Sequence, residues 1–170
     1  MLTKNFFAFL VATGSRLKVS NVAKDITGVA QGAFASSSTN IYAQYFASLH
    51  EMVKTESSGV WIGNGKTPPT PDDYKLENRI TAGFSFTNQS NKAVSVDEDG
   101  IHISATYGVT NTGTEPLEIS EIGLVSYHST GSSNSAYFMV ERTVLETPIV
   151  IPPNETRQIT YTISFRYPTA

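Results

Sequence analysis

The chain has 170 residues, a net charge of −3 and a charged fraction of only 16%, so we expect one compact domain with its own core. The 12 Lys and Arg residues are scattered and no cysteine is present, which argues against nucleic-acid binding, disulfide frameworks, thiolate metal sites and cysteine nucleophiles. No stretch approaches the roughly 20 apolar residues that cross a bilayer, and the 39 Ser and Thr residues, with abundant Val, Ile and Tyr, favour β-sheet.

Residues 1–57 are irregular, with polar segments between short apolar clusters. Leu2, Phe6, Phe9 and Leu10 lie at helical spacing and predict a short amphipathic helix over residues 3–12, with a strand as the alternative. A second helix, or a set of helical turns, is predicted over residues 39–54. The apolar positions there recur every three or four residues, at Tyr42, Tyr45, Phe46, Leu49, Met52 and Val53. We therefore expect a partly helical N-terminal region.

The first apolar cluster is also the candidate interface. Phe6, Phe7, Phe9 and Leu10 stand in a segment with few charges, and burial stabilises such a run. In one interpretation residues 1–57 form an arm that packs these side chains against neighbouring subunits. In the other, the phenylalanines cap the core of their own chain. The run loosely imitates a signal peptide, but its single lysine and seven apolar residues are minimal, so we expect it to be retained.

Residues 58–80 form a junction rich in glycine and proline. The sequence Gly-Asn-Gly-Lys-Thr at 63–67 ends like a phosphate-binding loop, but the first glycine of such a loop falls on Val60 and two prolines follow. We therefore favour a glycine-rich turn that leaves a strand over residues 60–62. Further on, Thr70 is followed by proline and two aspartates, which predicts the first turn of a helix.

Residues 81–167 alternate apolar and polar side chains with a period of two. The alternation is clearest in two runs and briefer in two others, at residues 101–109, 159–165, 84–86 and 94–96. It breaks step after Ile119, which predicts a β-bulge near Ser120 and Glu121. Short strands without helical patterns between them predict a mainly β fold, an antiparallel β-sandwich of the immunoglobulin-like or jelly-roll-like kind. This domain is expected to span 58–170, including the junction.

Groupings with catalytic or metal-binding chemistry are sparse. The three histidines have no metal-type spacing, so we expect no metal and no cofactor. No nucleophile motif points to an enzyme, and serine is common in turns and on sheet faces. Arg142 is expected to form a structural ion pair with Glu121 or Glu141.

Trp61 and Tyr74 are the candidate residues for a ligand site. Together with the aromatic residues near 42–46 they would offer a platform on which a sugar ring stacks. Aromatic residues in a small sheet protein are more often part of the core, so both interpretations stay open at this point.

Two segments resemble immunoglobulin-like sandwiches. They are residues 111–119, Asn-Thr-Gly-Thr-Glu-Pro-Leu-Glu-Ile, and residues 151–163, Ile-Pro-Pro-Asn-Glu-Thr-Arg-Gln-Ile-Thr-Tyr-Thr-Ile. In such domains a strand ends in an Asn-x-Gly turn and the last strand follows a corner led by proline. The resemblance implies a fold and says little about function.

A narrower resemblance lies in the order of four segments. They are Trp-Ile-Gly-Asn-Gly-Lys-Thr-Pro-Pro-Thr-Pro-Asp-Asp-Tyr-Lys-Leu-Glu at 61–77, Ile-Ser-Glu-Ile-Gly-Leu-Val at 119–125, Glu-Arg-Thr-Val-Leu-Glu-Thr-Pro-Ile at 141–149, and the corner and strand at 152–163. Over roughly residues 58–166 the chain resembles structural proteins of tailed bacteriophages, which are virion components encoded among head and tail genes.

That resemblance implies a non-enzymatic component of a virion, on the capsid surface or associated with the tail, assembled in the host cytoplasm. Its partners would be other virion proteins and copies of itself, without nucleic acid or membrane. The alternative on the same fold is a module that binds carbohydrate or a host surface, and this alternative needs an exposed Trp61 or an exposed tyrosine cluster.

Overall fold

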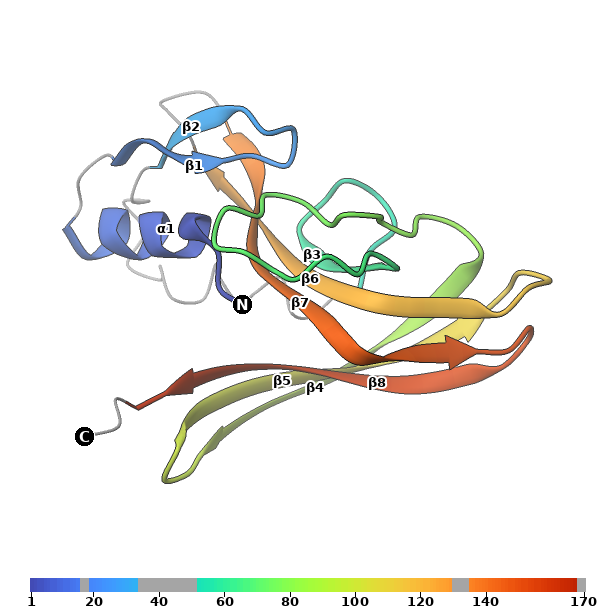
Figure 1. The fold of residues 1–170 in the computed structure, drawn as a ribbon. Helices are drawn as coiled ribbons and strands as arrows, with labels where there is room; N and C mark the ends of the chain where they lie inside the picture. The colour runs from blue at the N-terminus through green and yellow to red at the C-terminus, as the bar shows by residue number, and fades with distance from the viewer. Residues whose placement is uncertain (16–18, 34–51, 130–134, 168–170) are drawn as a thin grey trace.

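The computed structural model of the chain describes residues 1–15, 19–33, 52–129 and 135–167. These residues form one helix, α1 (Lys4–Ser15), and eight strands (Figure 1). The strands are β1 (Val19–Lys24), β2 (Ala30–Ala33), β3 (Gly59–Gly63), β4 (Phe84–Val96), β5 (Gly100–Asn111), β6 (Leu117–Ser129), β7 (Ser135–Ile151) and β8 (Thr156–Arg166). All pairings between these strands are antiparallel, so the fold is mainly β with antiparallel sheets and a single short N-terminal helix.

The strands form one hairpin and two three-stranded sheets. β1 pairs with β2, while the larger sheets have the orders β3–β6–β7 and β4–β5–β8. The chain leaves the first of these sheets after β3, returns for β6 and β7, and leaves again for β8, so each sheet contains a pair of strands distant in sequence. In Figure 1 the two larger sheets lie as two layers, and α1 lies beside one end of them, next to the β1–β2 hairpin.

One hydrophobic cluster takes residues from both three-stranded sheets and from α1. Phe84 on β4, Tyr107 on β5 and Leu124 on β6 are completely buried in it. Phe6 and Phe9 extend the cluster along α1, and Leu2 packs against its edge. The predicted N-terminal helix is therefore confirmed, and burial of its inner face against the sheets supplies most of the stability that so short a helix lacks alone.

The alternating runs at 101–109 and 159–165 are confirmed as strands β5 and β8. Their apolar residues turn towards the core, except that Ile101 at the start of β5 is 37% exposed. The predicted bulge is confirmed by a shift in the pairing of β6 with β7 between Ile119 and Glu121. The runs at 84–86 and 94–96 belong to one strand, β4. Val94 and Val96 are about two-thirds exposed, although the alternation places them on an apolar face. Alternation shows which side chains share a face of a strand, but it does not show how far another layer covers that face.

Two helix predictions need correction. Most of the predicted helix at 39–54 lies outside the described residues, and at its described end Met52 instead forms a parallel bridge with Val60. The predicted helix start at Thr70 is wrong. The carboxylate of Asp73 accepts from the backbone N–H and from the hydroxyl of Thr70, and the N–H of Asp73 donates to the carbonyl of Thr70 at 3.2 Å, which closes a single turn. No helix follows this turn, and the chain instead returns to β3, where Arg79 bridges Gly63.

Candidate functional site: a buried charge cluster under the junction loop

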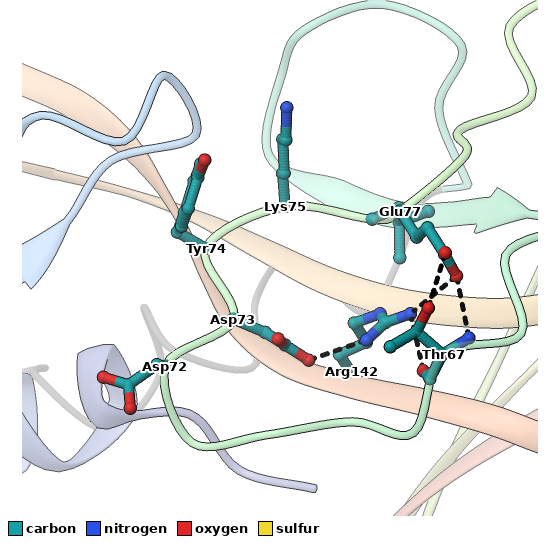
Figure 2. Close-up of a pocket in the computed structure, with 8 residues that line it drawn as sticks. Thr67, Asp72, Asp73, Tyr74, Lys75, Glu77 and Arg142 are labelled. Carbon is teal, nitrogen blue, oxygen red and sulfur yellow. Dashed lines mark hydrogen bonds and ion pairs between the residues drawn. The ribbon is translucent and has the colours of Figure 1, made fainter.

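The junction forms a loop whose two ends are fastened to the same strand. Gly63 at the end of β3 bridges Arg79, and the backbone N–H of Ile80 donates to the carbonyl of Ile62 at 2.9 Å. Residues 64–78, here called the junction loop, therefore leave β3 and come back to it. The side chain of Arg142 on β7 lies within the bend of the loop (Figure 2). Glu121 on β6 accepts hydrogen bonds from the backbone of the loop.

Glu121 is completely buried and accepts four hydrogen bonds. Its Oε1 atom accepts from the backbone N–H groups of Gly65 at 3.1 Å and Asn78 at 2.8 Å. Its Oε2 atom accepts from the N–H of Glu77 at 3.1 Å and from Nε of Arg142 at 2.9 Å. A buried carboxylate is costly unless it is paired and hydrogen-bonded, and these four donors supply both conditions. The bulge predicted from the sequence lies next to this carboxylate.

Arg142 is the cation of the cluster, and its side chain is only 3% exposed. Nη1 donates to Asp73 Oδ2 at 2.8 Å and Nη2 to the carbonyl of Thr67 at 3.1 Å, so the guanidinium joins the two sides of the junction loop to β6 (Figure 2). Burial disfavours its charge, but hydrogen bonds to Asp73 and Glu121 outweigh burial and raise the pKa of Arg142. The expected ion pair between Arg142 and Glu121 is therefore present.

Asp73 and Glu77 complete the cluster from the junction loop. Burial alone would raise the pKa of Asp73, but hydrogen bonds from Arg142 and Thr70 lower it, so the carboxylate stays ionised beside the guanidinium. A hydrogen bond from the hydroxyl of Thr67 contributes most to lowering the pKa of Glu77. Nη2 of Arg142 lies 3.8 Å from Glu77 Oε2, which makes this the weakest of the three ion pairs.

Two glycines allow the loop to approach Glu121 so closely. A Cβ atom at Gly63 would lie 2.5 Å from Glu121 Oε1, and one at Gly65 would lie 2.6 Å from the same atom. The backbone N–H groups of Lys66 and Thr67 donate to Glu77 Oε2 at 2.7 and 2.8 Å. The amides that a phosphate-binding loop would offer to an anion are thus used by a carboxylate of the same chain, and the predicted turn after a strand at 60–62 is confirmed.

A surface pocket of about 220 Å³ opens beside the cluster. Arg142 and Glu77 line it on one side, while Tyr74 and Lys75 point away from the guanidinium (Figure 2). All three guanidinium nitrogens of Arg142 already have partners, so this guanidinium is not free to bind an anionic ligand. Lys75, the other cation in the lining, has its Nζ atom 5.7 Å from the ring centroid of Tyr74. Across the described parts of the chain, no group of three His, Asp or Glu side chains is placed to hold a metal ion.

The structure divides the predicted interface residues between two environments. Phe6 and Phe9 are buried in the core of their own chain, as one of the two interpretations expected. Phe7 and Leu10 are 51% and 44% exposed. The four residues therefore do not form one surface, and only Phe7 and Leu10 are available to a partner.

Trp61 is packed inside the protein and does not form an open platform for a ligand. Its ring is 3% exposed, its indole N–H donates to the carbonyl of Ser57 at 3.0 Å, and the guanidinium of Arg79 lies 3.4 Å from the ring centroid. A sugar ring stacks only on a face that solvent reaches, and this face is covered. Tyr74 is partly buried on the junction loop, where its ring lies against the backbone of Gly28.

Glu141, the alternative partner expected for Arg142, is a second buried carboxylate, and the contacts that it makes instead were not predicted from the sequence. Glu141 on β7 accepts from the N-terminal ammonium of Met1 at 2.6 Å and from the hydroxyl of Thr143 at 2.6 Å, and it also accepts from the hydroxyl of Tyr161. Burial, followed by the charge of Glu141, raises the pKa of Tyr161. The period-two pattern places Tyr161 on the inner face of β8, but no local signal shows that the first residue of the chain lies beside β7.

Comparisons with protein-family models, with curated proteins and with solved structures find no match to this chain. Within the described residues, the structure contains no helix of the length and apolar character that crossing a membrane requires. The function is therefore argued from the geometry of the junction loop and the sheets.

Proposed function

We propose that the chain is a non-enzymatic structural component of a tailed-bacteriophage virion, on the capsid surface or associated with the tail. The observation that carries this proposal is that the segments resembling such proteins meet in one place. Asp73 and Glu77 come from the first of these segments, Glu121 from the second and Arg142 from the third, and ion pairs join them. Three of the four segments that carry the resemblance thus meet in one charge cluster, which holds the junction loop to β6 and β7.

The chemistry of this cluster supports a structural role. A general acid, base or nucleophile needs a group that reaches a substrate and changes its protonation or bonding. Glu121 has four partners and no exposed surface, and the guanidinium of Arg142 is held between two carboxylates and a carbonyl. Such a fully bonded network makes the loop rigid. A loop ordered in advance binds a neighbouring subunit with a smaller loss of entropy.

The same proposal includes the finer fold. We infer that the two three-stranded sheets form a β-sandwich of the immunoglobulin-like or jelly-roll-like kind, because one hydrophobic cluster draws on both sheets and the chain passes between them three times. The two segments that resemble an immunoglobulin-like domain meet at Asn111, which is 1% exposed. Its side-chain amide donates to the carbonyls of Glu115 at 2.7 Å and Ile151 at 2.8 Å.

Sedimentation of virus particles tests the proposed role. A lysate containing the chain is separated on a density gradient, and the particle fractions are washed at high salt and probed for the chain, with an abundant host protein as the control for carry-over. We expect the chain to stay with the particles after the host protein has been removed. A chain that remains in the soluble fractions while intact particles form without it contradicts the proposal.

The alternative function, binding of carbohydrate or a host surface, is favoured by a different pair of aromatic residues. Tyr127 on β6 is 53% exposed and pairs across the sheet with Tyr137 on β7, and their ring centroids lie 5.1 Å apart. Neighbouring tyrosines offer apolar faces together with hydroxyl groups, which suit a sugar ring. Binding on a glycan array that Tyr127→Ala abolishes, with an unchanged circular dichroism spectrum, would favour this function. A wild-type protein that binds no glycan would count against it.

A further inference from the structure

Both edges of the β3–β6–β7 sheet are covered by other segments of the chain. Along β3, the N–H of Val53 donates to the carbonyl of Val60 at 3.0 Å, and residues 78–80 bond to the other end of the strand. Along β7, the N–H of Thr3 donates to the carbonyl of Val140 at 3.1 Å, and the N–H of Arg142 donates to the carbonyl of Met1 at 3.0 Å. At both edges, other segments of the chain thus occupy part of the positions at which a strand from another molecule would pair.

The edges of the β4–β5–β8 sheet differ from each other. The pairing of β4 with β5 shifts in register between Gln89 and Lys92, and such an irregularity opposes pairing with a further strand. β8 pairs with β5 through all eleven of its residues, from Thr156 to Arg166, without a shift in register. On its other side no strand follows in the sheet order, and among the described residues no backbone hydrogen bond from another segment reaches it.

The central part of β8 contains none of the devices that protect a sheet edge, and the charges of this strand stand only near its two ends, at Arg157 and Arg166. Residues 158–165 include no proline, no lysine and no other charged residue. Thr160 and Thr162 are exposed on the outer face, and Ile159, Tyr161 and Ile163 are buried on the inner face. A pocket of about 200 Å³ lies between Met1 and Thr162, so the N-terminus lies near this edge without bonding to it.

We propose that β8 pairs antiparallel with β8 of a second copy, which joins the two β4–β5–β8 sheets into one continuous sheet of six strands. This inference rests on the proposed function, since it names one of the subunit contacts through which a virion component acts. It commits to a strand as the partner, because a row of unpaired backbone N–H and C=O groups is satisfied fully only by another strand.

A second copy is favoured because β8 is complementary to itself. A two-fold axis at Tyr161, the central residue of the strand, allows all eleven residues to pair and keeps the inner faces on the same side. Thr160 then faces Thr162 of the partner subunit, and threonine hydroxyls already pair across this sheet, at 3.0 Å between Thr106 and Thr160. Arg157 and Arg166 face uncharged residues, so no like charges meet.

Sedimentation equilibrium of the purified chain tests this pairing. We expect the wild-type mass to rise with concentration from 18.5 kDa to twice that value. The variant Thr160→Arg/Thr162→Arg places like charges directly opposite each other across the axis, so its dimer dissociation constant should rise roughly a hundredfold. The control Ser104→Arg/Thr106→Arg adds the same charges to the same face but on the central strand β5, and it should dimerise as the wild type does.

Hydrogen exchange provides a measurement without substitutions. In the wild type, amides of residues 158–164 that point away from β5 should exchange more slowly at high protein concentration than at low concentration. A wild type that stays at 18.5 kDa up to about 1 mM, where even a weak dimer forms, overturns the pairing. So does a control that dissociates together with the edge variant. A monomer that still sediments with particles contradicts the pairing alone, while a dimer absent from particles contradicts the virion role alone.

Discussion

Removal of the guanidinium in Arg142→Met should destabilise the protein far more than loss of an ion pair at the surface. The substitution leaves Glu121 completely buried and unpaired, although three backbone N–H groups still donate to it. Breaking a buried pair by removing one partner costs about 3–5 kcal/mol, and the retained amide bonds place the expected loss near the lower end, about 3 kcal/mol. That is a large part of the roughly 5–15 kcal/mol by which domains are stable.

Equilibrium unfolding in urea measures this loss, with the fluorescence of Trp61 as the probe because it is the only tryptophan and is buried beside the junction loop. The matched control is Lys4→Met, which breaks the exposed Lys4–Asp72 pair at 2.7 Å and should cost less than about 1 kcal/mol. The double variant Glu121→Gln/Arg142→Met removes both charges and should lose less than the sum of the two single variants. Equal effects of Arg142→Met and Lys4→Met would refute the role assigned to the cluster.

Three further predictions concern single positions. Burial lowers the pKa of His128 to about 4, so between pH 6.5 and 4 the unfolded chain takes up a proton that the folded chain does not. The free energy of unfolding should therefore fall by about 3 kcal/mol over that range, and His128→Phe should flatten this part of a stability curve measured by urea unfolding. Gly65→Ala places a Cβ atom against Glu121 and should lower the melting temperature, which differential scanning calorimetry measures, whereas an unchanged value would show that the junction loop adapts. Asn154 has a φ of 62°, so Asn154→Ala should cost about 1 kcal/mol while Asn154→Gly stays within about 0.5 kcal/mol, and equal losses in urea unfolding would contradict this account of the turn.

Strands β5 and β8 were predictable because their side chains alternate over a length that no helix would tolerate. The bulge beside Glu121 was predictable for the same reason, since an extra residue breaks the alternation at that point. The exposure of Val94 was not predictable, because it depends on how far the other sheet extends over β4. The alternation of side chains therefore predicts which residues share a face of a sheet, but it does not predict which part of that face another layer covers.

The charge cluster was only partly predictable. The sequence predicted a pairing of Arg142 with Glu121 or Glu141, and only the structure shows that Glu121 is the partner. The part played by Asp73 does not, because 69 positions separate it from Arg142 and its local sequence resembles the start of a helix. The fold of the junction loop brings Asp73 to Arg142. That fold depends on Glu121, which accepts hydrogen bonds from backbone N–H groups at both ends of the loop.

The copy number of the chain in purified particles tests the virion role most directly. Particles are washed at high salt, digested and quantified by mass spectrometry against a labelled standard of the chain, with a known major capsid protein as the internal reference. We expect a constant number of many copies per particle, which does not change between preparations or with further washing. A number that falls towards zero with washing, while the reference protein is retained, would contradict a structural role in the virion.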